Sequence, residues 1–257
     1  MQVDLQHRTF GEIVSLVFSV TFARFGQLVA IALVLGLPLL FFLSLTTSRP
    51  LDPSDVSIGA LLGAVGAWVL SVVVQFVAQG AYVLIVAGAF RGDHPTTWAA
   101  LSAALRRIGS LFAVSSLVGL AVGLGALAFL IPGLILFARY YVAVPALLVE
   151  ELSPAAAMQR SRVLTEDRKA LAFGVAVLVG AFIYLVVMVS ASAIAAYARD
   201  LSVLAAVAIQ WLVVSVSGIF GSVAAVVFYF QMRIEKEAYD VDSLAQLVDR
   251  IGERDAE

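Results

Sequence analysis

The chain has 257 residues, of which 62% are hydrophobic and 13% are charged, and its formal net charge is −2. A soluble domain is about half apolar and about a quarter charged, so this composition is typical of a protein that crosses a membrane several times. The lack of a basic surplus argues against a nucleic-acid partner, and the lack of cysteine excludes disulfides and thiolate chemistry. We expect no cleavable signal peptide, because no charged segment leads directly into the first apolar run.

Six long apolar runs follow one another along the chain, and each is close to the length of a membrane span. They are residues 25–45, 58–90, 108–130, 132–149, 170–198 and 201–232. The second and sixth are longer than a bilayer requires, so we expect them to tilt or to project beyond the headgroups. The third and fourth meet at residues 130–133, where Pro132 and Gly133 predict a tight external turn.

Basic residues fix the orientation of the predicted spans. Only Arg49 and Arg199 lie in the connections on one side of the membrane. The other side carries Arg8, Arg24, Arg91, Arg106, Arg107, Arg160, Arg162, Arg168, Lys169, Arg233, Lys236, Arg250 and Arg254. Because basic residues gather in cytoplasmic loops, both termini should be cytoplasmic.

A short helix-start signal precedes each odd-numbered span. Thr9 and Glu12 have the spacing of a capping box, Thr96 or Thr97 suits a second N-cap, and Ser153-Pro154 suits a third. We therefore predict three interfacial helices and an all-α membrane domain over 1–232. Its three repeats would each hold one interfacial helix and two spans, at about 9–90, 95–150 and 153–232. Alternatively, capped basic segments are simply common to six-span proteins.

The residues 233–257 form an acidic tail in which Leu244, Leu247, Val248 and Ile251 have the spacing of one helical face. This pattern predicts a short amphipathic helix. We favour docking of that helix on the protein's own cytoplasmic face, with binding to a partner as the alternative.

No residue pattern in the chain predicts catalysis, a metal site or a cofactor. The two histidines, His7 and His94, lie in predicted cytoplasmic segments and belong to no zinc-binding pattern. The intramembrane serines have no intramembrane histidine or lysine that could act as a base, which argues against a serine protease. We expect a protein without enzymatic activity of its own.

Four polar residues form a stripe on the second span. Ser71, Gln75, Gln79 and Tyr82 are spaced i, i+4, i+8 and i+11, so they share one helical face. Polar side chains in hydrocarbon need partners. We favour a glutamine zipper against another span, with Gln210 as a candidate partner, and the alternative is the lining of a polar cavity.

Arg139 lies inside the fourth apolar run, where a charge costs at least about 2.5 kcal/mol at mid-membrane. Three roles are open for it: bonding to carbonyls or to Gln75 and Gln79 within the bundle, binding of a lipid phosphate, and a place on a transport path. We favour the first. Glu150 lies on nearly the same helical face, but about 16 Å away in an ideal helix, unless Pro145 bends it.

One stretch resembles a known family. It contains Ile131-Pro132-Gly133, then Arg139, Pro145 and Glu150, and then the alanine-rich segment 155–164 with Arg160 and Ser161. This series is similar to the membrane domain of glycerophosphoryl diester phosphodiesterases and to related stand-alone bacterial inner-membrane proteins. The chain has no segment that could carry the phosphodiesterase barrel, so the resemblance implies no hydrolase activity here. It implies a location in a bacterial inner membrane and a role in lipid or envelope homeostasis.

Together these features predict a non-catalytic membrane protein that binds lipids or acts as a scaffold. Its partners would be membrane lipids and other envelope membrane proteins. The alternative is a permease for a small solute or a lipid-like molecule. The candidate residues for the lipid or polar-cavity site are Arg139, Gln75, Gln79, Ser71, Tyr82, Glu150, Arg160 and Ser161.

Overall fold

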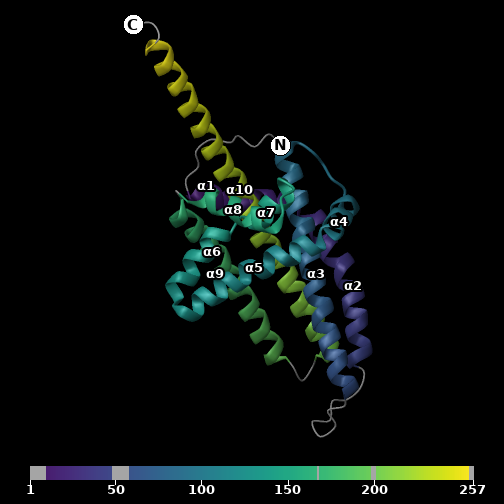
Figure 1. Cartoon of the computed structure of the whole chain (residues 1–257). Coiled ribbons are helices and arrows are strands. Elements are labelled where there is room, and N and C mark those ends of the chain that lie inside the picture. The colour runs from purple at the N-terminus through teal and green to yellow at the C-terminus, as the bar shows by residue number, and fades with distance from the viewer. Residues whose placement is uncertain (1–9, 48–57, 167, 198–200, 255–257) are drawn as a thin grey trace.

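The structure is a computed structural model that describes residues 10–47, 58–166, 168–197 and 201–254 (Figure 1). All regular secondary structure in these ranges is helical. The helices are α1 (Phe10–Ala23), α2 (Phe25–Thr47), α3 (Ile58–Arg91), α4 (Thr97–Arg106), α5 (Ile108–Ala128), α6 (Leu130–Tyr140), α7 (Ala143–Val149), α8 (Pro154–Thr165), α9 (Lys169–Ala196) and α10 (Val203–Arg254).

Five of these helices are long and apolar enough to cross a membrane, counting α6 and α7 as one span. A sixth is obtained if α1 and α2, which meet at an angle of 66°, are counted together. The predicted all-α membrane fold is therefore confirmed.

Four short helices form a layer at one end of the bundle, the upper end in Figure 1. They are α1, α4, α7 and α8. The Thr96 hydroxyl accepts a hydrogen bond from the Ala99 amide at 3.2 Å, and the Ser153 hydroxyl accepts one from the Ala156 amide at 3.4 Å. These N-caps, with Pro154 as the first helical residue of α8, are those that the sequence predicted. Thr9 lies outside the described residues.

The interfacial helices α4 and α8 pack on helices that precede them in the chain, whereas α1 packs on the last two. Helix α4 packs on α3 and α2, and α8 packs on α7, α6 and α5. Helix α1 packs on α10 and α9, the last pair of the chain, so the contacts close a ring. The threefold repeat itself remains a prediction.

The joint between each interfacial helix and the following long helix has the same backbone pattern. The carbonyls of Arg24, Arg107 and Arg168 each accept a hydrogen bond from the amide four residues later, so each joint arginine also begins the next helical turn. Their side chains reach neighbouring segments. Arg24 contacts the Nδ1 atom of His94 at 2.6 Å, Arg107 pairs with Glu151 at 3.1 Å, and Arg168 pairs with Glu235 at 3.4 Å.

The turn between α5 and α6 is tighter than predicted. The break consists of Phe129 alone, and Pro132 and Gly133 belong to the first turns of α6 instead of forming the turn. The place that a Cβ on Gly133 would take is only 2.8 Å from the Cα of Ala126. Glycine is therefore required at this position because the two helices pack backbone against backbone.

The predicted fourth span is interrupted in its second half. Helix α6 ends at Tyr140 and α7 begins at Ala143. Pro145 has no N–H to bond the carbonyl of Tyr141, which explains the break one turn before the proline. Helix α7 is buried along most of its length among α3, α5 and α8.

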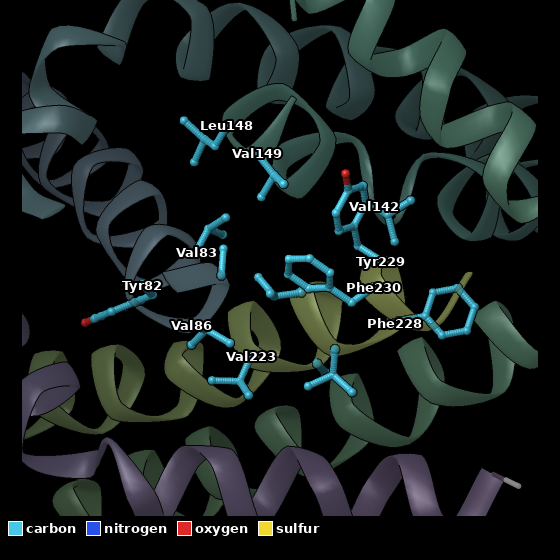
Figure 2. Packing of buried hydrophobic residues seen from close by; sticks show 14 of the residues in the cluster. Tyr82, Val83, Val86, Val142, Leu148, Val149, Val223, Phe228, Tyr229 and Phe230 are labelled. Atoms are coloured by element: carbon cyan, nitrogen blue, oxygen red, sulfur yellow. The ribbon is translucent and has the colours of Figure 1, made fainter. Parts of the chain in front are cut away.

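The bundle is densely packed at its upper end. Val83 and Val86 of α3 meet Val223, Phe228 and Phe230 of α10 in a core that also includes α7 (Figure 2). In the lower half, the same two helices expose large apolar side chains such as Leu61, Trp68 and Ile209. The short helices lie above this region, so the lower half in Figure 1 consists mostly of long helices.

The acidic tail does not form the separate short helix that the sequence predicted. Helix α10 runs without a break from Val203 to Arg254, and its C-terminal part projects away from the bundle (Figure 1). The side chains after Glu237, including the predicted apolar face of the tail, lie outside the described residues. What that face binds therefore remains a prediction.

Candidate functional site

A cavity of about 740 Å³ lies between α2, α3 and α10 in the lower half of the bundle. Its wall is apolar except for three side chains, Ser71, Gln75 and Gln210. The other lining residues are Leu39, Ala67, Trp68, Val72, Phe76, Val207, Trp211 and Val214. A volume of this size lies within the range of pockets that bind drug-sized ligands.

Glycine and tryptophan shape one side of this cavity. The Trp211 indole of α10 lies against Gly36 of α2, where a Cβ would collide with its ring atoms. The missing side chain of Gly36 thus gives the indole its place between the helices. Trp68 of α3 supplies a second large aromatic ring to the cavity wall.

The three polar side chains of the cavity differ in their hydrogen bonding. The Ser71 hydroxyl donates to the carbonyl of Trp68 at 2.7 Å, one turn earlier in its own helix. Gln210 accepts a hydrogen bond from the Ser190 hydroxyl of α9 at 3.3 Å. Within the described part of the chain, no protein group pairs with the Gln75 amide, which faces Gly218 of α10.

The predicted polar stripe is therefore split. Its lower half, Ser71 and Gln75, lines the cavity, whereas Gln79 is half-buried and Tyr82 is fully buried above it. Figure 2 shows the Tyr82 ring pointing away from the other labelled side chains of the core, and its hydroxyl has no partner among the described residues. Gln210, the candidate zipper partner, faces the same cavity as Ser71 and Gln75, and the hydrogen bond described for it comes from Ser190 rather than from the stripe.

Arg139 is held through its backbone rather than through its guanidinium. Its carbonyl accepts hydrogen bonds from the hydroxyls of Ser161 at 2.9 Å and Thr165 at 3.1 Å, both on α8. Arg139 thus lies where α6 reaches the layer of short helices. Its buried Nε has no partner within the described residues. The expected bonds to Gln75 and Gln79 are absent there, since Gln75 lines a cavity that Arg139 does not reach.

Glu150 and Arg160 belong to a polar network, described here as the Glu150 network, that joins α7, α8 and α10. Arg160 donates from its Nε to both carboxylate oxygens of Glu150, at 2.8 and 3.0 Å. The Tyr229 hydroxyl donates to the same carboxylate at 2.7 Å. Arg160 and Arg233 both donate to Glu237, at 3.0 and 2.8 Å.

Burial and pairing act on the charge of Arg160 in opposite directions. Burial lowers the pKa of its guanidinium, whereas the hydrogen bond and the charge of Glu150, together with Glu237, raise it, and the net pKa is raised. Arg160 therefore stays cationic. An arginine fixed between two carboxylates is suited to hold helices together.

Sequence reasoning missed Tyr229, Thr165 and Glu237. Tyr229 lies in the middle of an apolar stretch of α10, and its only signal is Arg233, four residues later, which donates to its hydroxyl at 3.3 Å. Thr165 stands four residues after Ser161 and so shares its helical face. Nothing in the sequence indicates which carbonyl that face would bind.

No family model, curated protein or solved structure matches the chain.

Proposed function

We propose that the protein is a non-catalytic membrane protein that binds one amphipathic lipid in the cavity between α2, α3 and α10. The observation that carries this proposal is the Gln75 amide. It lies in a largely apolar cavity beside Ser71 and Gln210, its side chain is exposed, and it pairs with no described protein group. An amide without a hydrogen bond in an apolar environment costs about 1–3 kcal/mol, so the site favours a ligand that supplies one.

The ligand is expected to combine an acyl chain with a nearby ester or hydroxyl group. The acyl chain matches the apolar wall, and the ester carbonyl or hydroxyl matches Gln75. This chemistry agrees with the likeness of residues 131–164 to membrane domains associated with glycerophosphodiester metabolism. A role in lipid or envelope homeostasis of a bacterial inner membrane follows as part of the same proposal.

The permease alternative requires a path that continues to the other end of the bundle. The described residues directly above the cavity are tightly packed, with Val77, Ala81 and Val83 of α3 almost fully buried. A lipid can enter and leave such a site sideways from the membrane, whereas a small polar solute would have to pass this packed apolar layer, which Gln79 and Tyr82 of the polar stripe interrupt. The cavity therefore favours lipid binding over solute transport.

The test uses the two tryptophans of the cavity wall, Trp68 and Trp211, as reporters. Phospholipid with brominated acyl chains is titrated into the detergent-solubilised protein, and tryptophan fluorescence is recorded. We expect saturable quenching in the unaltered chain. Val72→Phe fills the cavity and should weaken apparent binding at least about tenfold. Val69→Phe, the same change at an exposed site on the same helix, should not.

Quenching that never saturates, or that Val72→Phe and Val69→Phe affect equally, would show that only bulk detergent and lipid contact the tryptophans. Solute uptake into proteoliposomes that Val72→Phe blocks, without saturable quenching, would instead favour the permease.

A further inference from the structure

We infer that the hairpin of α5 and α6 is re-entrant: its tip at Phe129 ends inside the hydrocarbon of the membrane and contacts acyl chains. This differs from the external turn that the sequence predicted. The inference does not depend on the cavity between α2, α3 and α10, because it rests on a different part of the molecule.

The first observation is the composition of the hairpin. No charged residue occurs between Arg107 and Arg139. The other two connections on that side of the predicted membrane are polar: residues 48–57 contain Arg49, Asp52 and Asp55, and residues 198–200 contain Arg199 and Asp200. A turn that emerges into water is expected to resemble those two connections.

The second observation is the exposure of the tip. Leu127, Phe129 and Ile131 are 85%, 76% and 70% exposed, and Leu120, Leu124 and Ile135 are also exposed. Large apolar side chains on all sides of a hairpin tip are unfavourable in water and favourable in hydrocarbon. The occupant of this surface is therefore the acyl region of the bilayer.

The third observation is the position of the tip in the bundle. In Figure 1 the hairpin leans out to the left, and its tip lies above the lower ends of α3, α9 and α10. If those ends mark the far surface of the membrane, the tip stops short of it. The lipids below the tip then belong to a leaflet that this hairpin does not cross.

A hairpin can end in hydrocarbon only if its turn leaves few backbone groups unpaired. The turn here is a single residue, Phe129. Its amide donates to the carbonyl of Gly125 at 3.0 Å, and its carbonyl accepts from the amide of Gly133 at 3.4 Å. Both hydrogen-bonding groups of the turn residue are therefore satisfied without water.

The test is cysteine accessibility, which is clean because the chain has no cysteine of its own. Phe129→Cys and Leu127→Cys are compared with Ser54→Cys and Asp200→Cys in sealed, oriented vesicles with a membrane-impermeant maleimide. We expect the two controls to react from one side. The two tip cysteines should react from neither side, and should react fully once the protein is denatured in dodecyl sulfate.

A nitroxide label at the tip cysteines then identifies what surrounds them. We expect strong relaxation by oxygen, which concentrates in hydrocarbon, and weak relaxation by a water-soluble nickel complex. Maleimide labelling of Phe129→Cys at the rate of Ser54→Cys would overturn the inference by placing the tip in water. A label shielded from both oxygen and nickel would overturn the lipid contact, because a second protein surface would then cover the tip.

Discussion

The upper and lower halves of the α3–α10 pair are both apolar, yet they differ in packing. On α10, Ile219 is fully buried, whereas Ile209 is 43% exposed. The upper half of the pair is surrounded by the short helices α1, α4, α7 and α8, and most of the lower half is not (Figure 1). Lipid tails are as apolar as leucine, so an apolar side chain packs against protein only where a neighbouring helix is available.

This difference assigns separate roles to the two halves. The packed half, closed by the Glu150 network, behaves as a scaffold. The open half keeps the cavity and the unpaired Gln75 amide. Four substitutions, each with a matched control, test how closely the different parts of the molecule are packed.

The largest effect is expected from Ile219→Ala in the packed half. Truncation of a buried isoleucine costs about 2–5 kcal/mol, because the surrounding helices cannot fill the space. Ile209→Ala removes the same atoms from the same helix in the open half and should cost less than about 1 kcal/mol. Unfolding in mixed micelles with increasing dodecyl sulfate measures both free energies. Equal losses would show that the two halves are packed alike.

Arg160→Gln should reduce the free energy of unfolding by about 1.5–3 kcal/mol, the usual range for hydrogen bonds to charged groups. It removes the donors that Glu150 and Glu237 share in the described structure. Arg162→Gln is the control, because Arg162 is exposed and its side chain has no described partner. A thermal melt in detergent distinguishes the two variants. Similar melting temperatures would show that the Glu150 network does not hold α7, α8 and α10 together.

Gly133→Ala should cost about 1–3 kcal/mol by overpacking, because the new methyl group would meet the backbone of Ala126. Gly123→Ala lies on the facing helix of the same hairpin, where nothing lies within 4 Å of the new Cβ. It should be neutral or stabilising by up to about 1 kcal/mol, since alanine is the better helix former. The two substitutions should therefore shift the melting temperature in opposite directions, and shifts of the same sign would argue against close packing of α5 on α6.

The smallest effect is expected from Glu151→Gly. Glu151 has a φ of 55°, a left-handed conformation that glycine adopts without strain. It follows α7 in a turn closed by a hydrogen bond from the Leu152 amide to the Leu147 carbonyl at 3.1 Å. Relief of the strain should contribute about 1 kcal/mol, offset in part by loss of the exposed pair with Arg107.

Glu151→Ala separates these two contributions, because it removes the Arg107 pair but keeps the strain. Its melting temperature should be below that of Glu151→Gly. The opposite order would show that the left-handed conformation carries no strain.

Much of the fold could be predicted from local signals. Apolar length located the long helices, and the hydroxyls of Thr96 and Ser153 located the starts of α4 and α8. These signals act within one or two turns, so tertiary contacts do not alter them. The break after Tyr140 was harder to predict. Pro145 indicates that the helix is interrupted nearby, but the exact position of the break depends on the packing of neighbouring helices.

The candidate site depended on contacts that hydropathy cannot reveal. The polar face of α3 was correctly identified, but which of its residues meets a cavity depends on where α2 and α10 separate. For Arg139, the sequence indicated that a charge must be accommodated, yet its neighbours are supplied by α8, more than twenty residues later. A partner at that sequence distance is set by the fold alone.

Helix α10 connects two distant parts of the molecule. At 1.5 Å per residue, its 52 residues form a rod about 78 Å long, more than twice the thickness of a bilayer core. Val207 and Trp211, near one end of the rod, line the cavity, and Arg254 marks its other end. The densely packed part of α10 around Ile219 lies between these two ends. A single helix therefore connects the cavity wall, through the packed half of the bundle, with a segment that projects beyond the layer of short helices (Figure 1).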